Sequence, residues 1–214
     1  MRQLIKRFFY CLPFIGVFLR MRHVGYVDCD FSFWNYLKFC FLNRNKLFHY
    51  PKAKNCIVRH PQNMIIGVNS NIFKNGCYIQ GGGELTVGKY VRFANNIGVV
   101  TSNHKLTNQR EHDRGIVKLG DYCWVGMNAV ILPNVVLGPR TVVAAGAIVT
   151  KSFPEGFCVI GGNPAKKIKD IDSETFIEPK AKYEFYGWIP KEKYEKFKNK
   201  HLQKNSLLFP KNVT

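Results

Sequence analysis

The most regular feature of this chain is a hydrophobic residue at every sixth position across residues 119–149. The series is unbroken and consists of Leu119, Val125, Ile131, Leu137, Val143 and Val149. A helix buries residues at a spacing near 3.6 and a strand at a spacing of two, so neither element explains this period. A repeated unit does explain it, because stacked units place their hydrophobic residues in one column.

The positions between these hydrophobic residues fit a repeated unit of six residues, in which a short strand is followed by a bend. Small or β-branched residues follow the hydrophobic ones by four positions, namely Cys123, Ala129, Val135, Thr141 and Ala147. Glycine often comes directly after the hydrophobic residue, as at Gly120, Gly126 and Gly138, and glycine or asparagine permits backbone angles that other residues avoid. Three such units close a triangular coil, and stacked coils form one continuous apolar interior.

The same period begins earlier in the chain and is interrupted once. Its earlier members are Ile66 and Ile72, then Val87, Phe93 and Val99. The segment NHKLTNQREHDRG then breaks the period, which predicts an exposed loop at residues 103–116. A sandwich of antiparallel hairpins is the alternative, but it requires alternation with a period of two and repeated Asn-Gly turns. Since one such turn occurs, at residues 75–76, we predict an all-β solenoid over residues 56–170.

The two ends of the chain lack the period and are predicted to form separate segments. Residues 1–55 are basic and rich in aromatic residues, with a short helix expected over residues 30–43. Residues 171–214 are charged and aromatic, with a helix expected over residues 191–203. The predicted organisation is an N-terminal segment, a β-helix domain over residues 56–170 and a C-terminal tail.

The chain is strongly basic, with 32 Lys and Arg against 14 Asp and Glu and a formal net charge of +18. Such an excess favours an anionic partner: nucleic acid, anionic lipid or a phosphate-bearing small molecule. The sequence contains no zinc-finger spacing, no basic helix with heptads and no aromatic RNA-binding motif, so no nucleic acid is expected. The 7 cysteines include no Cys-x-x-Cys pair, which predicts reduced, mostly buried thiols in a cytoplasmic protein.

The N-terminus combines a basic start with an apolar run over residues 8–19 that is closed by Arg20 and Arg22. A transmembrane helix needs about 20 apolar residues, and a signal peptide needs a small-x-small cleavage site. Neither is present. Two interpretations stay open for residues 1–22: contact with an anionic membrane surface, at the inner face of the cytoplasmic membrane, or packing as an arm on this chain or a neighbour.

Four features together resemble the hexapeptide-repeat acyltransferases, which are left-handed parallel β-helix enzymes. They are the hexad series and the motifs SNHKL, LGDYCWVGMNAVILPNVVLG and AAGAIVTKSFPEGFCVIGGNPAKKIK. The N-terminal segment is closest in texture to capsular or exopolysaccharide (colanic acid type) O-acetyltransferases. The resemblance implies a left-handed parallel β-helix of hexapeptide repeats, acetyl-CoA as co-substrate, no metal, and a homotrimer whose active sites lie between neighbouring solenoids.

The resemblance also implies a catalytic residue. His104 matches the general base, which takes the proton of an acceptor hydroxyl so that the oxygen attacks the thioester of acetyl-CoA directly. His112 is the other histidine of the same loop and the less favoured base. The group that orients the ring stays open among a backbone carbonyl, Glu84, Glu111 and Asp113.

Other positions match the acetyl-CoA site of that family. Trp124 matches a wall of the transfer site, and Gly126 and Met127 match the coil whose backbone N–H faces the thioester oxygen. The positions that match contacts with the pantetheine arm and the nucleotide are Ala145, Thr150 and Lys151. The cations expected near the CoA phosphates are Lys166, Lys167 and Lys169.

The sequence gives fewer candidates for the acceptor site than for the acetyl-CoA site. Asn75 is the candidate acceptor contact, although its match to sugar acetyltransferases needs a shifted gap. The segment GGGE at residues 81–84 is expected to be a corner insertion that reshapes the acceptor pocket.

The expected function is acetyl-CoA-dependent O-acetylation of a sugar hydroxyl in surface-polysaccharide biosynthesis. An acetyltransferase for a small acceptor, such as an antibiotic, serine or an amino sugar, would use the same chemistry. A non-catalytic solenoid scaffold is the alternative outside enzymes. A zinc enzyme of the carbonic anhydrase type would need about three convergent histidines, which the repeat region does not supply.

Overall fold

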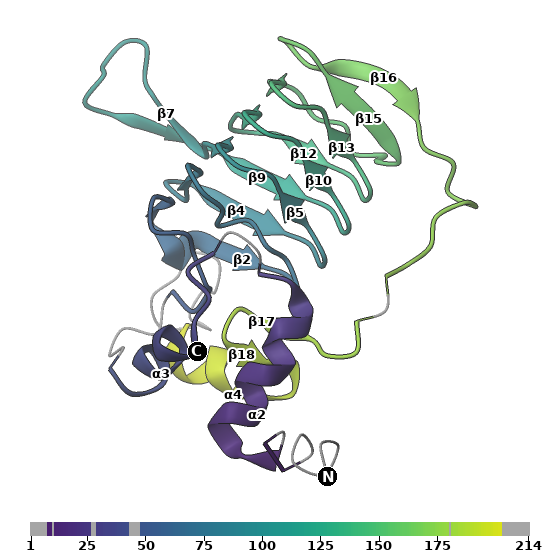
Figure 1. Cartoon of the computed structure of the whole chain (residues 1–214). Helices are drawn as coiled ribbons and strands as arrows, with labels where there is room; N and C mark the ends of the chain where they lie inside the picture. Colours follow the sequence, from purple (N-terminus) through teal and green to yellow (C-terminus); the bar gives the residue numbers. More distant parts are fainter. Residues whose placement is uncertain (1–7, 10, 27–28, 43–47, 180, 203–214) are drawn as a thin grey trace, which may run out of the picture.

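The hexad series forms the inner column of a three-sided parallel β-helix (Figure 1). The computed structural model describes residues 8–9, 11–26, 29–42, 48–179 and 181–202. Each full coil contributes one short strand to each of three sheets, and strands of successive coils pair in parallel. The predicted solenoid of parallel strands, with helices toward both ends, is confirmed.

The sheets are numbered here in the order in which the chain visits them. Sheet 1 consists of β1 (Ile57–Arg59), β3 (Tyr78–Gln80), β6 (Gly98–Val99), β11 (Val130–Ile131) and β14 (Ile148–Val149). Sheet 2 consists of β2 (Met64–Ile66), β4 (Glu84–Val87), β9 (Ile116–Leu119) and β12 (Val136–Leu137). Sheet 3 consists of β5 (Arg92–Phe93), β10 (Trp124–Val125), β13 (Val142–Val143), β15 (Cys158–Gly161) and the antiparallel closing strand β16 (Lys166–Asp170).

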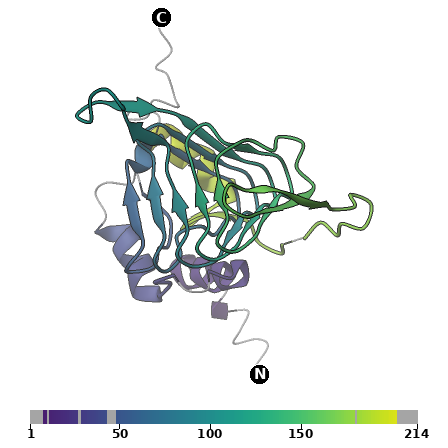
Figure 2. The ribbon, with the colours of Figure 1, turned by 90° about the horizontal axis from the view of Figure 1, so that it is seen from above.

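The register between coils places the hexad side chains directly above one another. Ile131 pairs with Val149 of the next coil and with Val99 of the coil before, and all of these side chains are fully buried. Because adjacent side chains of a strand point to opposite faces, Val130 points outward. Viewed along its axis, the β-helix is triangular in section, with the hairpin leaving one corner (Figure 2).

The glycines at the ends of strands are required for the close approach of successive coils and not for unusual backbone angles. A Cβ on Gly120 would lie 2.5 Å from the backbone nitrogen of Pro139 in the next coil, so glycine is required there by the close approach of the coils. The left-handed backbone conformation occurs two residues further on and is adopted by non-glycine residues, Tyr90, Tyr122 and Arg140. The expectation that these glycines supply unusual backbone angles was therefore wrong at this corner.

The two ends of the chain pack together beneath the first coil. The helices of this cap are α2 (Pro13–Met21), η1 (Arg22–Val24), α3 (Phe33–Phe41) and α4 (Lys191–His201), with β17 (Phe185–Tyr186) and β18 (Ile189–Pro190) between them. A short turn, η2 (Pro61–Asn63), belongs to the first coil. Trp188 is buried at the centre of the cap and stacks on Phe31, with ring centroids 5.4 Å apart. The predicted helices near residues 30–43 and 191–203 are confirmed with shorter bounds, and residues 43 and 203 lie outside the described residues.

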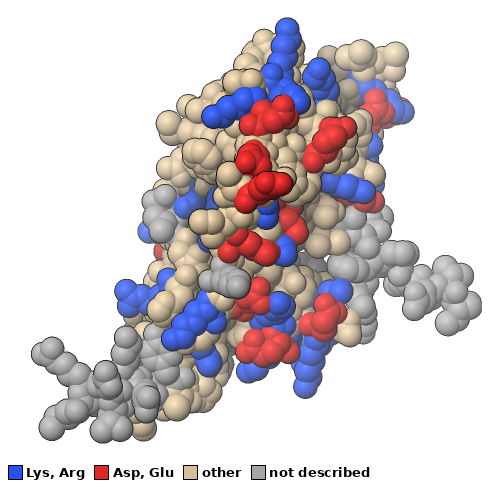
Figure 3. Space-filling view, turned by 90° about the vertical axis from the view of Figure 1, so that its right-hand side faces the viewer, with Lys and Arg blue, Asp and Glu red and all other residues tan. Residues whose placement is uncertain are grey.

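The chain between the β-helix and α4 runs back along the outside of the coils (Figure 1). Phe176 lies under the Arg140 guanidinium, 3.1 Å from its carbon to the ring centroid, and Glu178 pairs with Lys89 at 3.4 Å. Acidic and basic side chains are interspersed over this face (Figure 3). Such exposed ion pairs contribute about 0 to 1 kcal/mol each, so this segment is positioned by several weak contacts.

None of the seven cysteines, all of which lie in described parts of the chain, forms a disulfide, and most are out of reach of solvent. Cys56, Cys77, Cys123 and Cys158 are buried, whereas Cys11 is exposed. Burial raises the pKa of the Cys56 thiol to about 12 and that of Cys123 to about 11, which disfavours the reactive thiolate. No helix among the described residues is long and apolar enough to cross a membrane.

The inner column predicts a sharp contrast between neighbouring residues of one strand. Ile131→Ala removes a fully buried side chain at the middle of the stack and should lower the free energy of unfolding by about 2 to 5 kcal/mol. Val130→Ala, on the outer face of the same strand, should cost no more than about 1 kcal/mol. Denaturant unfolding followed by circular dichroism measures both, and equal losses would contradict the assigned inward and outward faces.

Candidate active site

The segment predicted as an exposed loop forms a hairpin that projects from the corner between sheets 1 and 2 (Figures 1 and 2). Its strands are β7 (Ser102–His104) and β8 (His112–Arg114), which pair in antiparallel fashion. The chain leaves sheet 1 after β6 and returns to sheet 2 at β9, so the flanking strands keep their places in the coil. The hairpin is therefore an insertion mounted on a rigid corner.

The His104 ring is held by the backbone of the hairpin. Its Nδ1 lies 2.5 Å from the carbonyl oxygen of Gln109. A carbonyl can only accept a hydrogen bond, so Nδ1 carries the proton and the lone pair of the neutral ring is at Nε2. Among the candidate orienting groups, the structure thus shows a backbone carbonyl. The exposed ring also packs beside His112, with ring centroids 4.3 Å apart.

The acidic residues of the hairpin have other partners. Glu111 accepts hydrogen bonds from Lys105 at 2.6 Å and from Asn108 at 2.9 Å. These bonds, with that from Lys105 the larger cause, lower the pKa of the Glu111 carboxyl. The bonds join the two sides of the hairpin tip near Gln109, so Glu111 braces the segment that orients His104.

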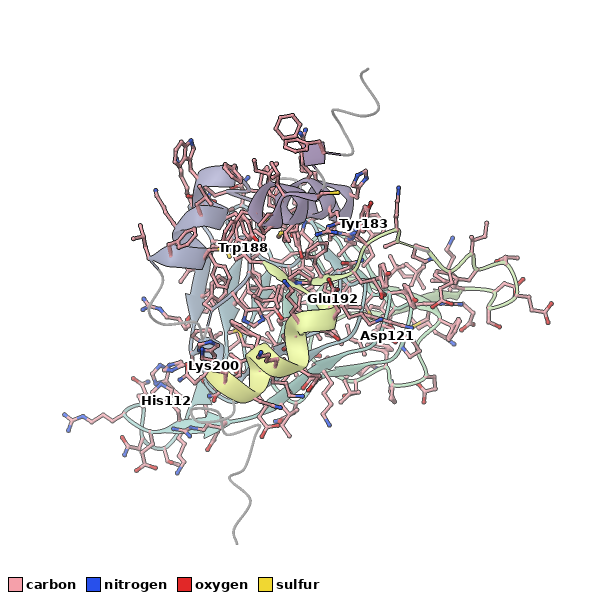
Figure 4. All side chains as sticks on the ribbon, turned by 90° about the horizontal axis from the view of Figure 1, so that it is seen from below. His112, Asp121, Tyr183, Trp188, Glu192 and Lys200 are labelled. Carbon is pink, nitrogen blue, oxygen red and sulfur yellow. The ribbon has the colours of Figure 1, made fainter. Side chains whose placement is uncertain are left out.

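Residues on one face of the hairpin line a polar pocket. Ser102 pairs with Arg114 and His104 with His112, and residues two apart on a strand share a face, so all four belong to one face of the ribbon. Beside it lies a pocket of about 360 Å³ lined by His60, Gln62, Asn63, Gln80, Gly82, Ser102, His112 and Arg114. His112 can be followed on the projecting hairpin in Figure 4.

The glycine-rich corner supports the base of the hairpin. The backbone N–H of Gly83 donates to Thr101 Oγ1 at 2.9 Å. The side-chain oxygen of Gln80 accepts from the backbone nitrogens of Thr101 and Ser102 at 3.1 and 3.0 Å. A Cβ on Gly83 would lie 2.0 Å from the carbonyl oxygen of Gly115, so only glycine fits between the corner and the hairpin. The GGGE segment thus borders this pocket through Gly82, and its effect on an acceptor pocket stays a prediction.

The other predicted residues lie elsewhere on the coils. Trp124 is exposed on the outer face of sheet 3, and Met127 and Ala145 lie one coil apart at the corner between sheets 3 and 1. The Gly126 N–H donates to the Val143 carbonyl at 2.8 Å and is therefore part of the ladder between coils. Within the described residues, no acceptor takes the Met127 N–H, which makes it the better candidate for an oxyanion donor.

The remaining candidates divide between two corners. Thr150 and Lys151 are exposed directly after β14, at the same corner as the hairpin but nearer the closing end. Asn75 lies at the corner between sheets 3 and 1, where its carbonyl accepts from Asn96 of the next coil at 2.9 Å. Asn75 is therefore not brought to the hairpin of its own chain.

The lysines of β16 are exposed on the closing strand. Lys167 is paired with Asp170 at 2.8 Å, whereas no ion pair is formed by Lys166 or Lys169 in the part of the chain that is described. The charges of these two lysines are therefore available to an anionic ligand.

A single chain does not bring the predicted site together. In a triangular coil the corner that bears His104 lies opposite sheet 3, which bears Trp124. The base and the predicted acetyl-CoA wall therefore face away from one another within one protomer. A site shared between neighbouring solenoids, as the resemblance implies, would satisfy this arrangement.

Sequence reasoning missed most of the pocket. His60, Gln62 and Arg114 come from the first coil and from the hairpin, and they were not singled out as site residues. Arg114 could have been found from the alternation of the ribbon, since it shares a face with His104. No group of three or more His, Cys, Asp or Glu residues that could hold a metal occurs within the described ranges.

Comparisons with known proteins agree with the fold. Residues 116–151 match the family model described as bacterial transferase hexapeptide (six repeats). A Staphylococcus aureus (strain MRSA252) protein named "Putative acetyltransferase SAR2635" is 32% identical over 51% of this chain, a match that spans 57% of that relative. The predicted resemblance to the hexapeptide-repeat acyltransferases is thereby confirmed for the coils.

Two solved structures extend the comparison. A maltose O-acetyltransferase from Clostridium difficile 630 aligns with a TM-score of 0.50 and 27% identity, covering 60% of this chain and 72% of that one. A hexapeptide-repeat-containing acetyltransferase from Vibrio cholerae O1 biovar eltor, complexed with acetyl coenzyme A, aligns with a TM-score of 0.55 and 22% identity, covering 76% and 92%. At this identity the second likeness concerns the fold alone.

The tight corner beneath the hairpin predicts a contrast between two glycines. Gly83→Ala should lower the free energy of unfolding by roughly 1 to 3 kcal/mol, because the added methyl group meets backbone atoms. Gly98→Ala is the matched control, since its Cβ would meet only Val130 side-chain atoms at 3.4 Å. Thermal unfolding of both variants provides the measurement. A Gly83→Ala protein as stable as the Gly98→Ala protein would contradict the claim that only glycine fits at this corner.

Proposed function

We propose that this protein transfers an acetyl group from acetyl-CoA to a sugar hydroxyl, with His104 as general base. The observation that carries the proposal is the hydrogen bond from His104 Nδ1 to the Gln109 carbonyl, which leaves Nε2 free to accept a proton. Among the described residues, the other candidate, His112, makes no such hydrogen bond to the backbone, and it lines the neighbouring pocket. A positioned histidine contributes about 10²- to 10⁴-fold to such proton transfers.

The proposed reaction is a direct transfer. The acceptor hydroxyl gives its proton to His104 Nε2 as its oxygen attacks the thioester carbon. The negative charge that develops on the thioester oxygen is stabilised by a backbone N–H, for which Met127 is the candidate. The intermediate then collapses, the C–S bond breaks, and the CoA thiolate takes the proton from Nε2. The histidine ends neutral, ready for another turnover.

The proposed acetyl-CoA site runs along the coils of a neighbouring protomer. Trp124 would wall the acetyl end, and Ala145, Thr150 and Lys151 would contact the pantetheine arm and the nucleotide. Lys166 and Lys169, which are exposed, have charge available for the phosphates. Because Trp124 faces away from His104 in one chain, we include in the proposal a left-handed β-helix assembled as a homotrimer, in which Asn75 could reach only a neighbour's hairpin.

The acceptor is proposed to be a precursor of a surface polysaccharide. The sugar acetyltransferase among the solved neighbours and the polar pocket beside the hairpin support a sugar. A small acceptor such as an antibiotic, serine or an amino sugar would require the same base and would be distinguished by the acceptor panel below. We also propose that the chain is organised into an N-terminal segment (residues 1–55), a β-helix domain (56–170) and a C-terminal tail (171–214).

The base predicts a specific loss of turnover. His104→Ala should lower kcat for acetyl transfer by about 10²- to 10⁴-fold while leaving the affinity for acetyl-CoA unchanged, because the ring accepts a proton and holds no part of CoA. Thiol release from acetyl-CoA in the presence of a panel of sugars, nucleotide sugars, serine and aminoglycosides provides the assay. Acetyl-CoA affinity is measured separately by calorimetry.

Two further histidine variants sharpen this test. His23→Ala, in the cap, controls for the loss of an imidazole far from the hairpin and should keep full turnover. His112→Ala should affect turnover less than His104→Ala. A larger loss from His112→Ala would exchange the roles of the two rings, and a His104→Ala protein with full activity would refute the assigned base. No binding of acetyl-CoA to the unaltered protein would refute the transferase itself.

A further inference from the structure

We propose that the pocket beside the hairpin binds an anionic group of the acceptor, a carboxylate or a phosphate. The inference rests on the proposed function, because it assigns a substrate class to the same site. Three of the residues that line the pocket can carry positive charge, namely His60, His112 and Arg114. Among the described residues that line it, none is Asp or Glu.

The guanidinium of Arg114 is the principal anchor. It is exposed at the pocket, and no ion pair holds it within the described part of the chain. Acidic residues lie nearby on the hairpin, but Glu111 is taken by Lys105. A planar guanidinium with free N–H groups matches the two oxygens of a carboxylate or phosphate, and such charge-assisted bonds are the stronger ones.

The uncharged groups of the pocket also present donors. The side-chain oxygen of Gln80 accepts from the backbone of Thr101 and Ser102 and from the Ser102 hydroxyl at 3.2 Å. The amide oxygen of Gln80 is thus turned toward the hairpin base, which leaves its NH₂ group as the end that can serve a ligand. The Gln80 NH₂ group beside the Arg114 guanidinium suits acceptor oxygens that carry negative charge.

The distance between the pocket and the proposed general base, His104, can be spanned by a sugar. His104 shares its ribbon face with Ser102 and Arg114, and a two-residue step along a strand is about 7 Å. An acceptor anchored at Arg114 by its anionic group can therefore extend along the ribbon and place a hydroxyl at His104. The anion would fix which hydroxyl is presented, so it would determine regiochemistry as well as affinity.

Binding to three matched probes tests the substrate class. Glucose, glucuronic acid and glucose 1-phosphate share a ring and differ in charge, and calorimetry on the full chain needs no turnover. We expect at least one anionic probe to bind about 10- to 100-fold more tightly than glucose, the range for one charge-assisted bond. Preference for glucuronic acid would identify a carboxylate, and preference for glucose 1-phosphate a phosphate. Equal binding of all three probes would overturn the proposal.

A pair of arginine variants locates the effect. Arg114→Gln should weaken the preferred anionic probe by about 10- to 100-fold and leave glucose unchanged. Arg110→Gln removes the same charge from the exposed tip of the same hairpin, outside the pocket, and should change neither. Equal losses in both variants would reduce the effect to net charge and refute the pocket. Anion binding without acetyl transfer to any acceptor would preserve this inference and refute the proposed function.

A second surface, on the cap, carries an independent inference: we propose that it binds an anionic lipid bilayer. Trp34, Phe41 and Leu42 of α3 are 73%, 66% and 72% exposed, although they are large and apolar. Phe14 of α2 contacts Phe41, with ring centroids 5.1 Å apart, so the two helices share one apolar surface. The preceding Phe8 and Phe9 are exposed as well.

The positive charge beside the apolar residues indicates that the partner of this surface is an anionic lipid bilayer. Lys38 lies between Trp34 and Phe41 at helical spacing, so a cation accompanies the apolar face of α3. The sequence before Phe8 adds Arg2, Lys6 and Arg7. Aromatic side chains beside cations suit the boundary between acyl chains and anionic headgroups. Membrane contact is one of the two interpretations left open for residues 1–22, of which residues 1–7 and 10 lie outside the described residues, and this proposal extends it to α3.

Sedimentation with vesicles tests this surface. The full chain should bind vesicles of phosphatidylcholine and phosphatidylglycerol and should bind pure phosphatidylcholine at least about tenfold more weakly. Trp34→Ser with Phe41→Ser should lower binding to the anionic vesicles by about tenfold or more. Leu106→Ser with Ile177→Ser removes exposed apolar side chains elsewhere and should leave binding unchanged. A cap variant that binds vesicles normally, or one that instead changes the oligomeric state in light scattering, would overturn the proposal.

Discussion

The parallel register between successive coils is the constraint on which the other features depend. Each strand is only two to five residues long, so no strand is stable alone, and the hydrogen bonds to the coils above and below supply its partners. The hexad column fixes this register, because a shift by one residue would turn Ile131 outward and Val130 inward. Insertions are therefore tolerated only where they leave and rejoin at the same corner.

The hairpin leaves and rejoins the coil at one corner, and this fixes the position of its first and last residues. β6 and β9 keep their pairings with neighbouring coils on either side of the insertion, so the base of the hairpin is as fixed as the β-helix. Its tip is held locally by hydrogen bonds among Lys105, Asn108 and Glu111. The result is an exposed histidine whose orientation is set by backbone geometry on a rigid mount, which is the arrangement that proton transfer requires.

The sequence was sufficient for the features that repeat and insufficient for those that depend on contacts distant in the chain. Ile131 and its equivalents reveal themselves by period, and His104 by its motif at the end of a coil. In contrast, the burial of Trp188 between the N- and C-terminal segments arises from residues more than a hundred positions apart, for which no local pattern exists. His60 and Arg114 likewise meet at one pocket only because the hairpin folds beside the first coil. The role of Gly120 was misjudged because the spacing between coils is a tertiary property.

The choice of a carbonyl as the partner of His104 has an electrostatic consequence. A carboxylate in that place would stabilise the imidazolium formed during proton transfer, whereas a neutral carbonyl orients the ring and offers only a dipole. On the pocket face, Arg114 carries a fixed positive charge further along the ribbon, which opposes a positive charge on the His104 ring. An acceptor that brings its own carboxylate or phosphate would offset this repulsion at the moment the proton moves. In that arrangement the substrate supplies the negative charge that many histidine bases obtain from the protein, and the proposed anionic acceptor and the proposed base become parts of one mechanism.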